Sequence, residues 1–533
     1  MLQTPSNTDR FRHLGLALSI FYLLYNLTTF YSVSLYEISP LRVHNLAIPF
    51  DNVVPFISGM IVPYSWSLVL FVMSFFLVRT SIQLSLLTYR LILATIFACL
   101  VFYLYPARFS FHRLIPDDWT QFGYQFLQLV DKPFNQLPSL HVSYAILLGV
   151  SLWDVAESKK RWIPVVYRLL LIGVCTLIAI STVLTYQHHL LDMVGGVALA
   201  VFVLWLSNKI RNALVIKYLT LGIIGFLLIA IAGFYLANMS MKAFELIETF
   251  AIIIALYWLI SFVMLACAYQ QVKPMHNIRW FNKTDNGRLT LSTRVKFAPI
   301  IIIYNAMSFL GQWYFKIISR GQSYALTPYS INNTVKVVAS PRLTQTSINS
   351  HLTNWLFGCN PLDWSHSLEK NWPLARYQII VVDLAAEISS HTYKLKVATK
   401  DMADVSIYYL YLYLPLLDLQ PLNDVLLKDY IDLFKRIDAL TRSAETQAIT
   451  ANNGSQIKDS VITLINFHCV MGLSRSIGVQ VLYLLYCGTL TVHNYESWLE
   501  QYYPHAHLNG TYLPQSLVEA VANYKSIEYP KTP

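Results

Sequence analysis

The stretch VITLINFHCVMGLSRSIGVQVLYLLY, residues 461–486, decides the fold of the C-terminal part of the chain. Val461 to Phe467 is rich in apolar and β-branched side chains, which is typical of a buried strand. Ile477 to Tyr486 is apolar over a length that favours a helix. The short stretch between them therefore predicts a loop that leaves the end of a strand and enters the start of a helix.

The sequence on both sides of this stretch repeats the alternation of strand and helix. Val335 to Val338 and Ile379 to Val382 are expected to be buried strands, and Leu426 to Leu440 is expected to be a helix. The polar stretch Thr441 to Asp459 is expected to be a surface loop. Alternating strands and helices favour an α/β fold, so residues 325–533 are predicted to form a soluble α/β domain.

The loop between strand and helix has the composition of an anion site. Successive backbone N–H groups at a helix N-terminus form a cradle for phosphate, and Gly472 allows the backbone to approach it closely. Arg475 can bind two phosphate oxygens at once. The same positive field favours the thiolate of Cys469, which is a nucleophile toward phosphorus. The residues predicted to bind phosphate here are Gly472, Ser474 and Arg475, and Ser476 is predicted to help the thiolate leave.

This loop resembles the HCxxGxxRS motif of dual-specificity and tyrosine phosphatases, over about residues 330–525. The resemblance implies an upstream aspartate as general acid, in a stretch reading tyrosine, apolar, proline, apolar, aspartate. Tyr413 to Asp418 fits with one extra apolar residue, so Asp418 is the candidate acid; a turn-capping role for it stays open, and Asp424 and Asp429 are weaker candidates. The implied substrate is a phosphomonoester carried on protein or lipid.

Apolar runs dominate the chain before about residue 315. Hydrophobic residues make up 55% of the 533 residues and charged residues only 13%, which is far from soluble usage. Eight stretches are long enough to cross a bilayer: 14–34, 57–78, 88–105, 141–156, 164–181, 189–207, 214–236 and 246–269. A ninth, 297–315, is expected either to span or to lie in the interface. The predicted architecture is thus an all-α membrane bundle (1–270), a basic linker with the ninth helix (271–324) and the α/β domain.

Basic residues gather in the connections between these stretches. The connections are Arg10/Arg12, Arg79/Arg90, Lys159 to Arg161, Lys209/Arg211 and Lys273 to Lys296. With eight spans, all five fall on one side, which the positive-inside rule makes cytoplasmic. The net charge of +10 therefore indicates membrane topology rather than binding to nucleic acid. The expected location is a bacterial inner membrane with the α/β domain in the cytoplasm, where thiols stay reduced.

A second group of reactive residues lies on the predicted outer side of the bundle. His188 and Asp192 are four residues apart and share one helical face. An aspartate there can fix the imidazole and leave its other nitrogen as a nucleophile. His141, at the start of another helix on the same side, is placed to protonate a leaving oxygen. The chemistry would pass through a phosphohistidine.

These residues resemble the type-2 phosphatidic acid phosphatase superfamily over about residues 85–210. Its motifs PSGH and SRxxxxxHxxxD are matched here at Pro138, Ser139, His141, Ser181, His188 and Asp192. Leu140 replaces the glycine, Thr182 replaces the phosphate-binding arginine, and the first motif is not recognisable. Arg108 and Arg113 are the nearby basic candidates for the phosphate, together with Ser139. The PSLH pattern is closer to the inositol-phosphorylceramide and sphingomyelin synthase branch, so headgroup transfer competes with hydrolysis.

Both mechanisms work without a metal or an organic cofactor. A metal held by His141, His188 and Asp192 stays open as an alternative, as do polar ties between helices, whereas His189 is expected to pack locally. The six cysteines show no paired spacing. The favoured interpretation is a phosphatase with two sites: a lipid phosphatase and a cysteine phosphatase. The alternatives are a lipid phosphotransferase with a regulatory phosphatase domain, and a non-catalytic receptor for a phosphorylated ligand.

Overall fold

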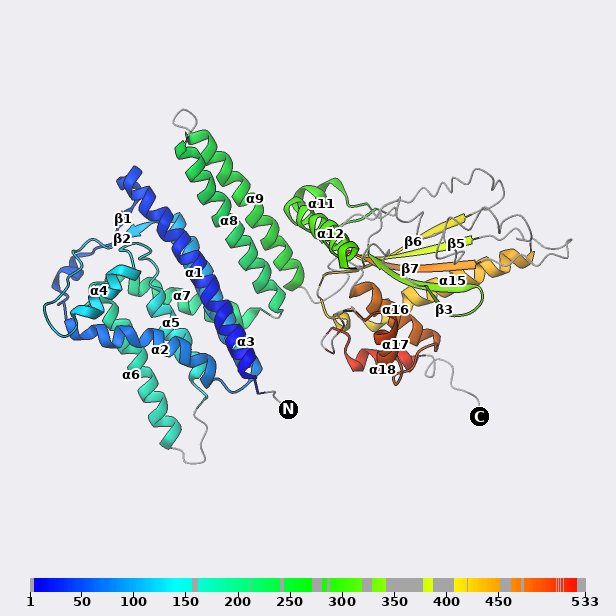
Figure 1. Ribbon diagram of the computed structural model, residues 1–533, viewed down its shortest axis with the longest axis horizontal. Helices are drawn as coiled ribbons and strands as arrows, with labels where there is room; N and C mark the ends of the chain where they lie inside the picture. Colours follow the sequence, from blue (N-terminus) through cyan, green and yellow to red (C-terminus); the bar gives the residue numbers. More distant parts are fainter. Residues whose placement is uncertain are drawn as a thin grey trace. The chain divides into compact units, whose positions relative to one another are not determined.

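The computed structural model describes residues 4–155, 162–210, 212–239, 244–270, 280–284, 288–318, 328–341, 377–386, 407–418, 420–450, 462–470, 474–504, 506, 508, 510 and 512–524. The chain divides into two compact units, Met1–Ala266 and Cys267–Pro533. The first unit is almost entirely helical, and the second is built on a five-stranded sheet (Figure 1).

The helices of the first unit begin and end where local sequence dictates. Its helices are α1 (Asn7–Ile38), α2 (Ile61–Leu77), α3 (Ser81–Leu104), α4 (Gln121–Val130), α5 (Leu140–Leu152), α6 (Trp162–Leu184), α7 (Leu190–Lys209), α8 (Ala213–Met239) and α9 (Phe244–Gln270). At the start of α3, Thr80 and Gln83 form a capping box, in which each side chain accepts a hydrogen bond from the other's backbone N–H. Helix α3 is the most buried helix at the centre, packing on α1, α5, α7 and α8.

Within the described residues, seven helices are long and apolar enough to cross a membrane: α1, α2, α3, α6, α7, α8 and α9. The protein is therefore a multi-pass membrane protein. The prediction of a full span at 141–156 is wrong, because α5 contains 13 residues and is about 20 Å long. The assignment of Arg90 to a connection is also wrong. It lies inside α3, buried, and donates hydrogen bonds to Ser151 and Ser207.

The sheet of the second unit has the strand order β3-β4-β7-β5-β6. The strands are β3 (Tyr329–Ser330), β4 (Val335–Pro341), β5 (Tyr377–Ala385), β6 (Ile407–Leu416) and β7 (Ile462–Cys469). Strands β4, β7, β5 and β6 are parallel to their neighbours, and β3 runs antiparallel to β4. The three predicted strands correspond to β4, β5 and β7, so the expected α/β character is confirmed for the described part of this unit.

Helices cover this sheet through one apolar core. The C-terminal helices are α15 (Leu427–Thr450), α16 (Arg475–Cys487), α17 (Tyr495–Tyr502) and α18 (Gln515–Ala522), and they lie on one side of the sheet in Figure 1. Phe434, Phe467 and Tyr483 pack ring against ring in this core. The loop predicted at Thr441 to Asp459 is wrong up to Thr450, because good helix formers such as Ala444 and Glu445 continue α15. Residues 451–459 lie outside the described part.

The segment before the sheet is more structured than a linker. It forms α11 (Leu291–Lys296) and α12 (Ala298–Ile318), and Phe281 stacks on Phe297 with 4.5 Å between ring centroids. Both rings are completely buried. The described residues 280–284 and 288–297 therefore belong to the second unit.

Candidate functional sites

His188 and Asp192 meet at the junction between α6 and α7. Their Nδ1 and Oδ2 atoms are 3.4 Å apart, and the Asp192 side chain is completely buried. The same Oδ2 atom accepts a hydrogen bond of 2.8 Å from the His189 backbone N–H, which fixes the carboxylate at the start of α7. At 3.4 Å the contact between carboxylate and imidazole is mainly electrostatic, and it orients the ring. The opposite ring nitrogen, Nε2, is then available for a reaction.

A tight turn after α6 sets the direction of His188. The Thr182 carbonyl accepts hydrogen bonds from the backbone N–H groups of Gln187 and His188, at 3.1 and 3.0 Å. Tyr186 adopts a left-handed φ of 56° in this turn, and its hydroxyl donates to the Val54 carbonyl. Thr182, where the resemblance expects an arginine, therefore shapes the backbone and brings no positive charge to the site.

His141 lies on the second residue of α5 and faces His188. The two ring centroids are 6.0 Å apart, and the Tyr64 ring is 4.5 Å from His141. The backbone N–H of Ser139 donates a hydrogen bond of 3.0 Å to the Asp192 carbonyl, and this bond ties the two motifs together. Within the described residues the Ser139 hydroxyl is buried without a hydrogen-bond partner, and Ser139 is not among the residues that line the cavity described below.

Two glycines of α7 allow the close approach of α5. A Cβ atom on Gly196 would lie 2.6 Å from the Ser139 carbonyl oxygen and 2.8 Å from Val142 Cβ. One on Gly195 would lie 2.4 Å from a Leu137 methyl group. Sequence reasoning did not single out these glycines, although a Gly-Gly pair within an apolar helix indicates close packing.

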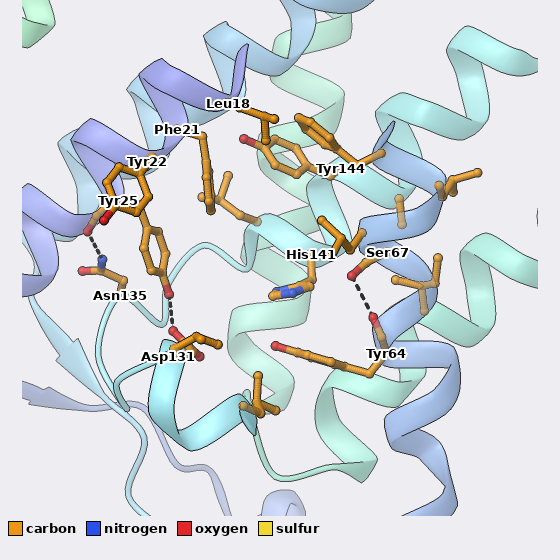
Figure 2. Close-up of a pocket in the computed structure, with 18 of the residues that line it drawn as sticks. Leu18, Phe21, Tyr22, Tyr25, Tyr64, Ser67, Asp131, Asn135, His141 and Tyr144 are labelled. Atoms are coloured by element: carbon orange, nitrogen blue, oxygen red, sulfur yellow. Dashed lines mark hydrogen bonds between the residues drawn. The ribbon is translucent and has the colours of Figure 1, made fainter. Parts of the chain in front are cut away.

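A cavity of about 390 Å³ opens onto both histidines. Its wall is mostly apolar, and it also includes Tyr25, Asp131 and Asn135. The lining residues come from α1, α2, α4, α5 and α6 and from the segments beside them. Figure 2 shows His141 pointing into this space beside Tyr64, with Tyr25 and Asp131 joined by a hydrogen bond of 2.7 Å. Its volume suits an organic ligand, and its apolar wall suits a hydrocarbon chain.

The two arginines predicted to bind phosphate point elsewhere. Arg108 donates a hydrogen bond to the Tyr36 hydroxyl and lies over that ring at 4.6 Å. Arg113 donates to the Asp131 carbonyl at 3.0 Å and pairs with its carboxylate at 3.4 Å. Arg113 is thus one residue removed from the cavity, and neither arginine lines it.

His189 belongs to a separate, fully buried pair with Asp51. The His189 Nδ1 and Asp51 Oδ2 atoms are 3.4 Å apart, and the Ser110 N–H donates to His189 Nε2 at 3.2 Å. Asp51 also accepts from the backbone N–H groups of Leu190 and Ile48. His189 was expected to pack locally, whereas these contacts join it to residues that are distant in the sequence. Sequence reasoning missed Asp51, because no spacing links it to residues about 140 positions away.

In the second unit, Cys469 ends β7 and Arg475 begins α16. The Cys469 Sγ atom is 3.5 Å from the Ser476 hydroxyl oxygen. The Arg475 guanidinium is 1% exposed and donates to the Leu416 carbonyl at 2.7 Å. Its other terminal nitrogen pairs with Asp418 at 3.1 Å. The structure thus brings together four predicted residues: Cys469, Arg475, Ser476 and Asp418.

The remaining predicted residues of this site have different placements. Asp424 lies in a short 3₁₀ helix and Asp429 in the first turn of α15; burial raises the pKa of both. The carboxylate that pairs with Arg475 is that of Asp418. Ser474 directly precedes α16, whereas Gly472 lies outside the described residues.

A buried charge network lies beside the cysteine, and sequence reasoning missed it. Lys283 Nζ is 2.6 Å from Asp383 Oδ2, and both side chains are 1% exposed. Asp383 Oδ1 is 3.7 Å from His468 Nε2. Burial alone would raise the pKa of the Asp383 carboxyl, but Lys283 and His468 hold it below its usual range. Among the residues that the structure describes, no three His, Cys, Asp or Glu side chains are grouped to hold a metal ion.

Comparisons with known proteins give one family match and one weak structural likeness. Residues 83–216, which contain His141, His188 and Asp192, match the family model of the PAP2 superfamily. This domain indicates a phosphatase that acts on phosphorylated lipids. Among solved structures, "Crystal structure of Tk-PTP in the active form" is similar at 14% identity and a TM-score of 0.20, over 37% of this chain and 97% of its own. No curated protein sequence matches the chain.

Proposed function

We propose that this chain, which carries a PAP2 superfamily domain at residues 83–216, is a membrane phosphohydrolase with two separate sites. The first is a histidine-dependent lipid phosphatase. The observation that carries it is that His141 and His188 line one cavity within a membrane-spanning bundle, with Asp192 behind His188.

The groups at this site support a two-step reaction. His188 Nε2 attacks phosphorus, the bond between phosphorus and the lipid oxygen breaks, and His141 donates a proton to that oxygen. Water then attacks the phosphohistidine and passes a proton to His141. The P–N bond breaks and inorganic phosphate leaves. Asp192 stabilises the imidazolium that forms at His188.

The apolar wall supports a lipid as the substrate. Leu18, Phe21 and Phe71 line the cavity from α1 and α2, which lie outside residues 83–216. Burying a hydrocarbon chain against such side chains is favourable by about 0.8 kcal/mol per methylene group. A water-soluble phosphate ester gains none of this binding energy.

A labelled lipid phosphate tests this site and separates hydrolysis from transfer. The purified chain in detergent receives ³²P-labelled phosphatidic acid, with and without a lipid alcohol. We expect labelled inorganic phosphate in both cases, and none from His188→Asn. Label appearing on the alcohol would instead support a phosphotransferase, for which the synthase-like PSLH motif is the argument.

The second site is a cysteine-dependent phosphomonoesterase. The observation in its favour is the meeting of Arg475 with Asp418 beside Cys469, at the carboxyl end of a parallel strand. Ligand sites of parallel sheets lie at this end of the strands. The loop side chains Val470 and Ser474 carry no charge, so a phosphoprotein or a phospholipid with few phosphates suits the site better than a highly anionic headgroup.

The residues of the second site also divide the reaction into two steps. The Cys469 thiolate attacks phosphorus, the ester P–O bond breaks, and Asp418 donates a proton to the leaving oxygen. Water then attacks the phosphocysteine, Asp418 takes its proton, and the S–P bond breaks. The Ser476 hydroxyl, 3.5 Å from Sγ, stabilises the departing thiolate.

Turnover of a soluble aryl phosphate tests the second site against a non-catalytic receptor. We expect Cys469→Ser to remove this turnover and Cys487→Ser, which changes a cysteine at the far end of α16, to keep it. Equal rates in the wild type and Cys469→Ser would support a receptor for a phosphorylated ligand.

We also propose that the protein resides in a bacterial inner membrane with the second unit in the cytoplasm. The need of the proposed Cys469 thiolate for a reducing compartment supports this orientation. In intact cells, a membrane-impermeant maleimide should leave Cys469 unlabelled until the membrane is opened. Labelling before that would place the site on the outer side.

A further inference from the structure

The second unit buries a lysine that comes from the segment preceding its sheet. Besides the 2.6 Å contact with Asp383, Lys283 Nζ donates to the Ala385 carbonyl and lies 4.6 Å from the centre of the Tyr413 ring. A buried ammonium group is costly unless it is paired and hydrogen-bonded. Lys283 satisfies this condition through the ends of two strands, β5 and β6.

Asp383 connects this lysine to the cysteine motif. Its Oδ2 atom also accepts a hydrogen bond of 2.7 Å from the Tyr411 hydroxyl, and its Oδ1 atom accepts one of 3.0 Å from the Ala385 N–H. In the sheet register, Asp383 is the direct partner of His468 on β7. His468 precedes Cys469, so the carboxylate lies one residue away from the proposed nucleophile.

We propose that Lys283 is a positioning residue for the cysteine site, acting through Asp383 and His468 on the loop that holds Cys469. This inference rests on the proposed cysteine phosphatase function. It makes the segment before the sheet a part of the site: by neutralising Asp383, Lys283 prevents an uncompensated negative charge beside the thiolate.

The groups around Cys469 and Asp383 determine how the Lys283–Asp383 pair affects the Cys469 thiol. Cys469 is faced by Ser476 and Tyr512, and Tyr512 also interacts with Arg475 and Asp418. Asp383 is faced by Lys283, His468 and Tyr411, with Tyr413 beyond Lys283. Removal of Lys283 leaves a negative charge next to His468 and disfavours the thiolate. Removal of the Asp383 charge leaves the positive charge of Lys283 unbalanced and favours the thiolate.

The test is the rate of Cys469 alkylation by iodoacetamide as a function of pH, in the full chain in detergent. Mass spectrometry of the Cys469 peptide separates it from the other cysteines. We expect Lys283→Met to raise the apparent pKa of the thiol by about one unit and Asp383→Asn to lower it by about one unit, the size expected for one charge roughly 10 Å away at an effective dielectric constant of about 20.

Three further variants serve as controls. The double variant Lys283→Met/Asp383→Asn removes both charges and should return the thiol pKa to the wild-type value. Lys283→Arg keeps the charge and should also stay near the wild type. Arg294→Met removes an exposed basic residue of the same segment and should have no effect.

Shifts in the same direction for both single variants, or no shift in either, would overturn the proposal, because a merely structural role does not reverse sign with charge. If Lys283→Met does not fold, the double variant is compared with Asp383→Asn, and loss of the lysine must raise the thiol pKa by about one unit. The titration uses no substrate. Absence of Cys469-dependent turnover in the wild type therefore refutes the proposed function without deciding the role of Lys283.

Discussion

At the scale of residues, both proposed sites combine one nucleophile with a buried carboxylate or arginine that comes from a neighbouring element. His188 has Asp192 at 3.4 Å, and Cys469 shares its loop with Arg475, which reaches Asp418 at 3.1 Å. Such neighbours orient the proposed reacting groups, so their loss should affect the rate more than the fold.

Substitution of His141, the proposed acid of the membrane unit, should reduce catalysis without preventing the protein from folding. We expect His141→Asn to lower lipid phosphate hydrolysis by about 10²–10⁴-fold, since a positioned general acid contributes that much. The measurement is phosphate release by the purified chain at saturating lipid. His112→Asn, at an exposed histidine of the same unit, should retain the wild-type rate. An unchanged rate in His141→Asn would refute its role.

The buried Asp383 pair should make the stability of the second unit depend on pH. Because the folded-state pKa of Asp383 lies below its unfolded value, its contribution is present above the unfolded pKa of about 4. It is lost as the pH falls through the folded pKa. The urea midpoint, followed by pulse proteolysis of a C-terminally tagged chain, should therefore fall below pH 4.

The double variant Lys283→Met/Asp383→Asn is the control for this pH dependence. It has no carboxylate to titrate at this position, so its midpoint should fall less steeply over the same interval. Parallel curves for the wild type and the double variant would contradict this account.

The residues proposed to react were inferred from the sequence, but only some of the neighbours that the structure gives them were. His188 with Asp192, and Cys469 with Arg475, are close in the chain, so spacing alone relates them. Asp51 and Lys283 are each separated from their partners by a hundred residues or more, so only folding brings them together. No local sequence pattern predicts such a contact. The arginine positions were predicted from proximity in sequence, and the fold turns Arg108 toward Tyr36 instead.

At the scale of elements, the histidine site depends on how closely α5 and α7 approach each other. The Ser139 N–H bonds to the Asp192 carbonyl, and the Ser143 hydroxyl donates to the Gly196 carbonyl at 2.9 Å. These contacts fix the position of His141 relative to His188. They are possible because Gly196 has no side chain. The sequence predicted α7 well. Helix α5, in contrast, ends at Leu152 and is shorter than the predicted span.

A methyl group on Gly196 should therefore separate the two histidines. We expect Gly196→Ala to cost about 1–3 kcal/mol through overpacking and to lower lipid hydrolysis by about 10²-fold through misplacement of His141. Phosphate release and the detergent-solubilised melting temperature measure the two effects. Gly173→Ala is the matched control in α6, because in the described structure no atom outside the surrounding backbone of α6 lies within 4 Å of its added Cβ. Equal rates for the two variants would contradict this view of the helix crossing.

At the scale of the whole molecule, composition alone indicated two units of different character. In the described part of the chain the apolar runs include seven helices long enough to span a membrane, and the mixed sequence that follows forms a mostly parallel sheet. Apolar runs identified β4, β5 and β7, because buried parallel strands are nearly continuously apolar. The packing of Phe281 and Lys283 into the second unit was not predictable, because a polar segment next to a membrane helix has the composition of a linker.

The central claim, that one chain holds two independent phosphohydrolase sites, is tested most directly by a crossed assay. The wild type, His188→Asn, Cys469→Ser and the double variant are each given a labelled lipid phosphate and a soluble aryl phosphate. The account predicts that His188→Asn loses only lipid hydrolysis, that Cys469→Ser loses only aryl phosphate hydrolysis, and that the double variant loses both. Loss of both activities in either single variant, or of neither, would contradict it.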